Sequence, residues 1–167
     1  MTPDVPAPAP GTDQGTGHGT DQGIDPDVDL ADAAQRAELA LHPLRLLGAV
    51  SIGGVLGSEA RYGLTLAFPD APGGVPWTTF AVNVFGSLAI GALMVAVRRW
   101  GGRRPWLRPF AGVGVLGGFT TFSAYTVGVE RLLDGGRVVP AVGYLVITPV
   151  TAVAAAFAGQ WLGRRVL

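Results

Sequence analysis

The chain has 167 residues, of which 49% are hydrophobic and only 14% are charged, whereas about a quarter of the residues of a soluble domain are charged. Long apolar runs with few charges exclude an ordinary soluble enzyme, a coiled coil and a nucleic-acid-binding domain. The sequence has no cysteine, which excludes a disulfide scaffold and a thiolate metal site. The net charge of zero combines two unlike segments: residues 1–43 carry eight of the twelve acids and one arginine, and residues 44–167 carry four acids and eleven arginines. We therefore predict an all-α membrane protein with an acidic polar tail.

The tail, residues 1–43, is rich in Pro at its start and in Gly, Thr, Asp and Gln from Gly11 to Gly23. Such a composition offers too little apolar surface to offset the entropy lost on folding. The segment also lacks the basic and apolar regions of a secretory signal. We predict that residues 1–43 form a disordered cytoplasmic extension and that residues 44–167 form a transmembrane domain.

Four apolar spans follow the tail, at residues 46–68, 77–97, 110–133 and 138–162, and each is close to the roughly 20 residues that a transmembrane helix needs. The segments that separate them contain Pro, Gly or both, which end helices. Tryptophans lie at the span ends, as interfacial aromatic residues do. The sequence thus predicts four transmembrane helices.

Arginines lie mainly on one side of this arrangement. Five arginines fall within residues 98–108, Arg164 and Arg165 are close to the C-terminus, and Arg45 precedes the first span. The positive-inside rule then places both termini in the cytoplasm. We expect a multi-pass membrane protein, and the family resemblance described below implies a bacterial plasma membrane.

Polar residues inside the spans are costly in hydrocarbon and therefore need a partner or a function. Asn83 and Ser87 share one face of the second span, and Tyr144 and Thr148 share one face of the fourth. Residues 117–125 place glycines and hydroxyl groups in the third span, and broken backbone at membrane depth is tolerated only where it is buried or lines a water-filled path. A single hydroxyl in a membrane helix usually bonds to its own backbone, but the three groups together indicate a polar conduit.

Enzyme chemistry is not indicated. Both histidines, His18 and His42, precede the first span, and no nucleophile is paired with a base. Two other functions stay open at this point. A small four-helix proton-coupled multidrug or cation exporter would use Glu59 as its carboxylate, and a structural subunit would only pack helices, as the Gly53-x-x-x-Gly57 and Gly114-x-x-x-Gly118 patterns also suggest.

Three motifs make the chain recognisable. GGVLGSEARY at residues 53–62, TFAVNVFGS at 79–87 and GGFTTFS at 117–123 resemble the signatures of the Fluc or CrcB family of fluoride-specific ion channels. The resemblance extends over all four spans. It implies a passive, fluoride-selective channel that exports cytoplasmic fluoride and lowers its toxicity, with the lipid bilayer as its environment and no nucleic-acid partner.

The resemblance also implies an architecture and a set of site residues. Two four-helix subunits with a break in the third helix would form an antiparallel, dual-topology dimer that needs no organic cofactor. A structural Na⁺ ion at the dimer interface would be held by the backbone carbonyls of Gly117 and Thr120, and Arg61 would match a structural arginine. The residues implied for the fluoride pore are Asn83, Phe122, Ser123, Tyr125, Tyr144 and Thr148. Their amide, hydroxyl and positive aromatic-edge groups are suited to replace the water around a small anion.

The sequence departs from the family pattern in three ways. Tyr125 stands where phenylalanine is usual, and Ala152 stands where a hydroxyl is expected, next to Thr151 and close to a helix-kinking Pro149. The arginine bias favours one fixed orientation, whereas an antiparallel homodimer needs a chain that inserts both ways. We therefore expect a dimer either with itself or, as the bias favours, with a related subunit of opposite orientation.

Overall fold

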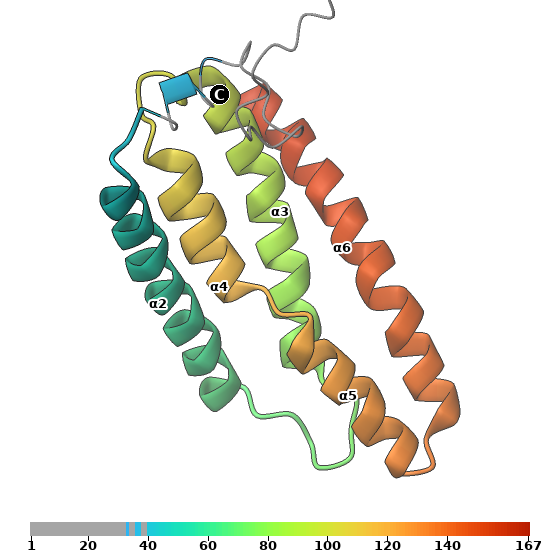
Figure 1. The fold of residues 1–167 in the computed structure, drawn as a ribbon. Coiled ribbons are helices and arrows are strands. Elements are labelled where there is room, and N and C mark those ends of the chain that lie inside the picture. The colour runs from blue at the N-terminus through green and yellow to red at the C-terminus, as the bar shows by residue number, and fades with distance from the viewer. Residues whose placement is uncertain (1–32, 34–35, 38–39) are drawn as a thin grey trace, which may run out of the picture.

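The computed structural model describes residues 33, 36–37 and 40–167 (Figure 1). The predicted disorder of the tail mostly concerns residues outside this part of the chain. No strand occurs among the described residues, so the all-α prediction is confirmed. The helices in chain order are α2 (Pro43–Ala67), α3 (Trp77–Trp100), η1 (Leu107–Leu116), α4 (Gly117–Phe119), α5 (Ser123–Asp134) and α6 (Val138–Val166).

Proline and glycine set several helix ends. α2 begins with Pro43, whose missing N–H is no loss at the first position of a helix, and it ends just before Pro69. The turn between α5 and α6 contains Gly136 with φ of 70°, a left-handed conformation that glycine adopts without steric cost. These signals lie where the sequence predicted breaks between the spans.

Two helices extend further than predicted. α3 ends at Trp100 and α6 at Val166, and each has two arginines in its last turn, Arg98 with Arg99 and Arg164 with Arg165. The prediction that residues 98–100 belong to a loop is therefore wrong. Cations at a helix C-terminus interact favourably with the helix dipole, so these arginines prolong the helices instead of ending them.

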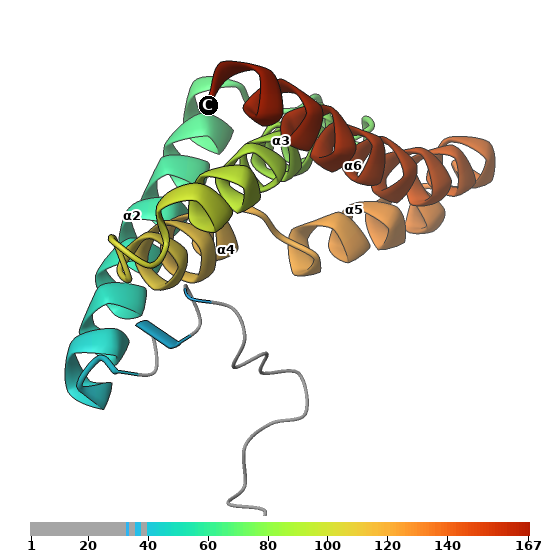
Figure 2. The same ribbon diagram turned by 90° about the horizontal axis from the view of Figure 1, so that it is seen from above.

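Glycines bring the helices into close contact in two pairs. α2 packs on η1 and α4, since a Cβ atom at Gly57 would collide with the carbonyl of Val115. α3 packs on α6, since a Cβ atom at Gly91 would collide with the carbonyl of Ala156. Both pairs run side by side in Figures 1 and 2. The close packing indicated by the glycine patterns of the first and third spans is confirmed.

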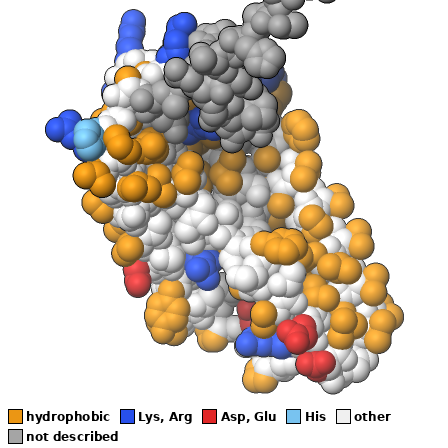
Figure 3. Space-filling model, viewed as in Figure 1, with side chains coloured by type: hydrophobic (Ala, Val, Ile, Leu, Met, Phe, Trp, Pro, Cys, Tyr) orange, Lys and Arg blue, Asp and Glu red, His pale blue; other side chains and the backbone are white. Residues whose placement is uncertain are grey.

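Three segments of the described chain are long and apolar enough to cross a membrane: Trp77–Trp100, Leu107–Asp134 and Val138–Val166. α2 has 25 residues but is not among them, and its second half carries Glu59 and Arg61. The predicted count of four spans is therefore not confirmed. Large hydrophobic side chains are exposed over the helices (Figure 3), as on a surface that faces lipid.

Candidate functional site

The third span is broken at residues 120–122, between α4 and α5. Thr120 leaves the helix with an extended backbone, φ −76° and ψ 155°, and Figures 1 and 2 show α5 displaced from the line of η1 and α4. The predicted break in the third helix is confirmed. Thr120 lies at this break, and Gly117, the first residue of α4, lies three residues before it.

The side-chain amide of Asn83 in α3 holds the break in place. Its Nδ2 donates to the carbonyl of Thr121 at 2.9 Å, and its Oδ1 accepts from the backbone N–H of Thr121 at 2.8 Å. Asn83 is only 9% exposed, so its largely buried amide is satisfied by the partly buried backbone groups of the break. An asparagine amide has two N–H donors, and no described residue accepts from the second one.

Hydroxyl groups close the two helix ends at the break. Thr120 Oγ1 donates to the carbonyl of Leu116 at 2.9 Å. Thr121 Oγ1 accepts from the backbone N–H of Ala124 at 3.1 Å and lies 3.2 Å from Ser123 Oγ, and so it caps the first turn of α5. Thr121 holds the site through both its backbone and its side chain, although the sequence-based set of site residues omitted it.

A cavity of about 390 Å³ lies between α3, the break and α6. Four of the six residues predicted for the pore line it: Asn83, Phe122, Tyr125 and Thr148. Ser87, which the predicted set also omitted, lines the same cavity. Its position four residues after Asn83 was the signal that could have added it, because residues four apart share a helix face.

Ser123 and Tyr144, the other two predicted pore residues, lie outside this lining. Ser123 is exposed at the start of α5, beside Thr121. Tyr144 lines a second cavity of about 190 Å³ on the same side of α6, together with Trp77, Phe80 and Ile147. Tyr144 lines the smaller cavity and Thr148 the larger one. The two residues are one helical turn apart, so the two cavities lie next to each other along α6.

Tyr125 explains one departure from the family pattern. Its hydroxyl donates to the carbonyl of Leu145 at 2.5 Å. In a regular helix that carbonyl would accept from the N–H of residue 149, but residue 149 is proline, which has none. Tyr125 therefore satisfies a carbonyl that Pro149 leaves without a helical donor, while its ring lies between Phe122 and Tyr144, with centroids 5.6 and 5.4 Å away.

This pairing predicts a specific coupling. Tyr125→Phe is expected to lower the free energy of unfolding by about 1–3 kcal/mol, because the Leu145 carbonyl loses its donor. In a Pro149→Ala background the same substitution should cost much less, since the new backbone N–H at position 149 bonds to Leu145. A double-mutant cycle of denaturant unfolding in detergent measures the coupling. Equal losses in both backgrounds would contradict the pairing.

Tyr144 and Thr148 carry the polar groups of the site that lack partners. Tyr144 and Thr148 are 5% and 3% exposed, and among the described residues neither Oη of Tyr144 nor Oγ1 of Thr148 has a hydrogen-bond partner of ordinary length, although the two hydroxyls lie near each other on α6. A buried hydroxyl without a partner costs about 1–3 kcal/mol. Groups left in this state next to a cavity are suited to bind a polar ligand that enters it.

The second predicted departure concerns the next turn of α6. Ala152 lines the larger cavity, whereas the hydroxyl of Thr151 lies within hydrogen-bond distance of the carbonyls of Ile147 and Thr148, at 2.7 and 3.0 Å. Thr151 thus bonds to its own helix. It does not supply the hydroxyl that is missing at position 152.

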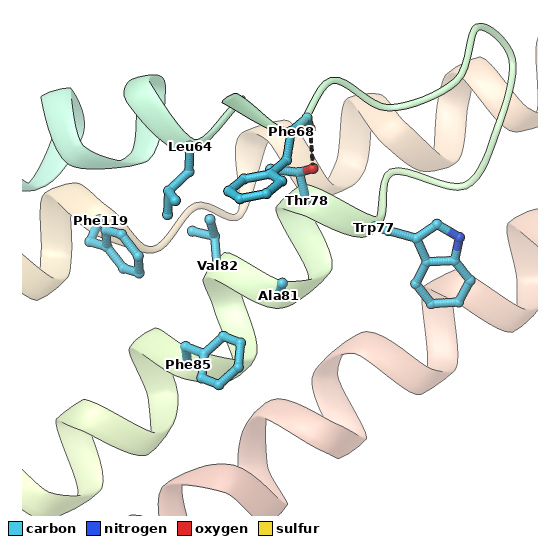
Figure 4. A pocket seen from close by; sticks show the side chains of 8 residues that line it. All are labelled: Leu64, Phe68, Trp77, Thr78, Ala81, Val82, Phe85 and Phe119. Atoms are coloured by element: carbon cyan, nitrogen blue, oxygen red, sulfur yellow. Dashed lines mark hydrogen bonds between the residues drawn. The ribbon is translucent and has the colours of Figure 1, made fainter. Parts of the chain in front are cut away.

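A third cavity, of about 300 Å³, lies among α2, α3 and α4 and is almost wholly apolar (Figure 4). The hydroxyl of Thr78, one of its lining residues, is already bonded to the carbonyl of Phe68. The other lining side chains are Leu64, Phe68, Trp77, Ala81, Val82, Phe85 and Phe119. The almost wholly apolar lining suits a hydrocarbon chain.

Arg61 links α2 to the break. Its Nε donates to the carbonyl of Gly118 in α4 at 3.3 Å. Glu59, two residues earlier, is exposed and lies outside the lining of all three cavities described above. The guanidinium of Arg61 therefore contacts the backbone next to the break, and the carboxylate of Glu59 does not line the cavity that contains Asn83 and Thr148.

Comparison with known proteins identifies the family. The sequence profile of the family "CrcB-like protein, Camphor Resistance (CrcB)" matches residues 48–160. The chain is 49% identical over 124 residues to the fluoride-specific ion channel FluC 2 of Nocardia farcinica, covering 74% of this chain and 88% of that protein. It is 43% identical over 122 residues to FluC 1 of Streptomyces coelicolor (73% and 79% covered), and 41% identical over 115 residues to FluC of Paracoccus denitrificans (69% and 91% covered). As its three motifs indicated, the chain belongs to the family of CrcB-like proteins.

Proposed function

We propose that this chain is a subunit of a passive, fluoride-selective ion channel that exports fluoride from the cytoplasm and so lowers its toxicity. One structural observation carries the proposal: the hydroxyls of Tyr144 and Thr148 are buried with no hydrogen-bond partner in the described part of the chain, and Thr148 shares a cavity with Asn83. The names of the relatives, fluoride-specific ion channels, point to the same ion.

The chemistry of the site suits a small, strongly hydrated anion. Such an ion enters a membrane only where hydrogen-bond donors replace its water. The second N–H of Asn83 and the free hydroxyls of Tyr144 and Thr148 are donors of this kind, and the positive edge of the Phe122 ring can face an anion. Ser123 adds a hydroxyl to these donors on the exposed side of the break. Tyr125 contributes its ring to the cavity, because its hydroxyl is engaged by Leu145.

The proton-coupled exporter is not supported. That function needs a carboxylate in the transport path, and Glu59 is exposed on α2, outside the lining of the cavity that contains Asn83 and Thr148. The relatives are named as channels for fluoride. Passive flow down a fluoride gradient is therefore the mode of transport that we propose.

The active unit would be an antiparallel dimer with Na⁺ at its interface. Gly117 and Thr120 fit a carbonyl-bound cation in kind, because Thr120 lies at the break, Gly117 lies three residues before it, and backbone oxygens are hard ligands. No cluster of His, Cys, Asp and Glu that could hold a metal occurs in the described part of the chain. Two carbonyls are too few to surround a hard cation, so the same pair from a second subunit would complete the site, and the ion would supply positive charge between the two broken helices.

The orientation of the subunit would be fixed. The arginines at the ends of α3 and α6 favour both termini in the cytoplasm. A subunit with this bias pairs antiparallel most readily with a related chain of opposite bias, which makes a heterodimer our preferred assembly.

Fluoride efflux from liposomes that contain the chain, alone and together with an oppositely oriented relative, tests the passive channel when neither ATP nor a pH gradient is present. We expect efflux to proceed under these conditions and to be unchanged in Glu59→Gln. If efflux requires a proton gradient and Glu59→Gln abolishes it, the exporter replaces the channel.

A further inference from the structure

We propose that the acidic N-terminal segment of this chain, residues 1–32, docks on the arginine-rich end of its own helix bundle. We call this surface the arginine end. It consists of the last turns of α3 and α6 and the loop after α3, and its arginines are Arg98, Arg99, Arg103, Arg104, Arg164 and Arg165.

The arginine end is a strong and unneutralised positive patch. All six arginines are exposed, and Figure 3 shows blue side chains gathered at the upper end of the bundle. None of the six guanidinium groups has an acid or a hydrogen-bond acceptor among the described residues, although Arg165 lies over the ring of Trp161, 4.0 Å from its centroid. Repulsion among like charges held this close favours an anionic partner.

The folded part of the chain has no acid to neutralise this end. Residues 44–167 contain four acids, Glu59, Asp70, Glu130 and Asp134. Asp70 lies between α2 and α3, and Glu130 and Asp134 lie in the last turns of α5. These positions are at the opposite end of the bundle (Figure 1). Glu59 lies in the second half of α2, whereas the start of α2 is the part nearer to the arginine end.

The N-terminal segment has the complementary charge, and the residue that follows it lies beside the arginine end. Residues 1–32 contain seven acids and neither Lys nor Arg. Ala33, the residue after this segment, adjoins the loop of the arginine end: a Cβ atom at Gly102 would lie 3.5 Å from the Cβ of Ala33. Gly102 precedes Arg103 and Arg104 directly.

Covalent linkage favours this occupant over others. A segment tethered by a short connection has an effective concentration on the order of millimolar at its target. Anionic lipid headgroups are the competing occupant, since arginines at a membrane surface attract them. Residues 1–32 are joined to Ala33 beside the loop of the arginine end, whereas headgroups have no such tether, and we therefore commit to residues 1–32.

The test is a distance measurement on the full chain in bilayers. Because the sequence has no cysteine, Thr20→Cys and Val166→Cys place two spin labels specifically, and dilution with unlabelled chain removes distances between subunits. In zwitterionic bilayers we expect a population of short distances that falls about fivefold or more when salt rises from about 0.1 M to about 1 M, because the Debye length shortens from about 10 Å to about 3 Å.

Two comparisons identify the contact. Asp-to-Asn substitution at residues 21, 25, 27, 29 and 32 should remove the short distances at low salt, and Arg131→Gln at the other end of the bundle should leave them unchanged. A population of short distances that changes neither with salt nor with the Asn substitutions would overturn the proposal. So would short distances that disappear when anionic lipid is added, because headgroups would then occupy the arginines. The readout is independent of transport, so failure of the fluoride proposal leaves it intact.

Discussion

Asn83→Ala is expected to abolish fluoride efflux and to destabilise the subunit at the same time. The substitution leaves both the N–H and the carbonyl of Thr121 without the partners that Asn83 provides at 2.8 and 2.9 Å. Each buried backbone group without a partner costs about 1–3 kcal/mol. The substitution also removes the free N–H donor that the proposed ion path requires.

Ser87→Ala is the matched control for this prediction. Ser87 lies one turn after Asn83 and lines the same cavity, but no hydrogen bond joins it to the break. Unfolding in detergent and fluoride efflux from liposomes are measured for both variants. We expect near-normal stability for Ser87→Ala, and a wild-type stability for Asn83→Ala would contradict the role of Asn83 in holding the break.

The double variant Tyr144→Phe with Thr148→Val is expected to reduce fluoride efflux while leaving stability unchanged or higher. Both hydroxyls are buried with no partner among the described residues. Their removal therefore breaks no hydrogen bond and should leave the free energy of unfolding unchanged or higher. A hydrogen bond to a charged group contributes about 1.5–3 kcal/mol. Loss of one such bond to the ion corresponds to a fall in efflux of about tenfold to a hundredfold, and the double variant loses at least that much.

The opposite signs make this prediction specific. A purely structural role for the two hydroxyls predicts that stability and efflux fall together. Thr151→Val serves as the control on the same helix, because its hydroxyl is already bonded to the carbonyls of Ile147 and Thr148, and it should leave efflux near the wild-type rate. Undiminished efflux in the double variant would remove Tyr144 and Thr148 from the ion path.

Local sequence signals predicted much of the fold. Proline and glycine predicted the helix ends near Pro69 and Gly136, and the glycines and hydroxyl residues of segment 117–125 predicted the break. Helix ends and membrane spans were predicted less accurately where charged residues occur within or next to an apolar segment. The arginines after residue 97 resemble a loop by composition but lie in helical last turns, and the charges of Glu59 and Arg61 leave α2 less apolar than the other spans.

The site was predictable in its residue types but not in its pairings. Spacing placed Asn83 with Ser87, and Tyr144 with Thr148, on common helix faces. The bond between Asn83 and Thr121 joins residues 38 apart, and no local pattern reports such a contact. The bond from Tyr125 to the carbonyl opposite Pro149 depends on how α5 and α6 align, so sequence reasoning noted both residues as departures without connecting them.

Fluoride efflux measured against chloride efflux, from liposomes that contain this chain alone and then together with an oppositely biased relative, tests the proposed function most directly. We predict rapid efflux of fluoride and almost none of chloride, either from the chain alone or, as its arginines favour, once the relative is present. Equal efflux of both anions, or no fluoride efflux in either preparation, would contradict the assignment of this chain to a fluoride-selective channel.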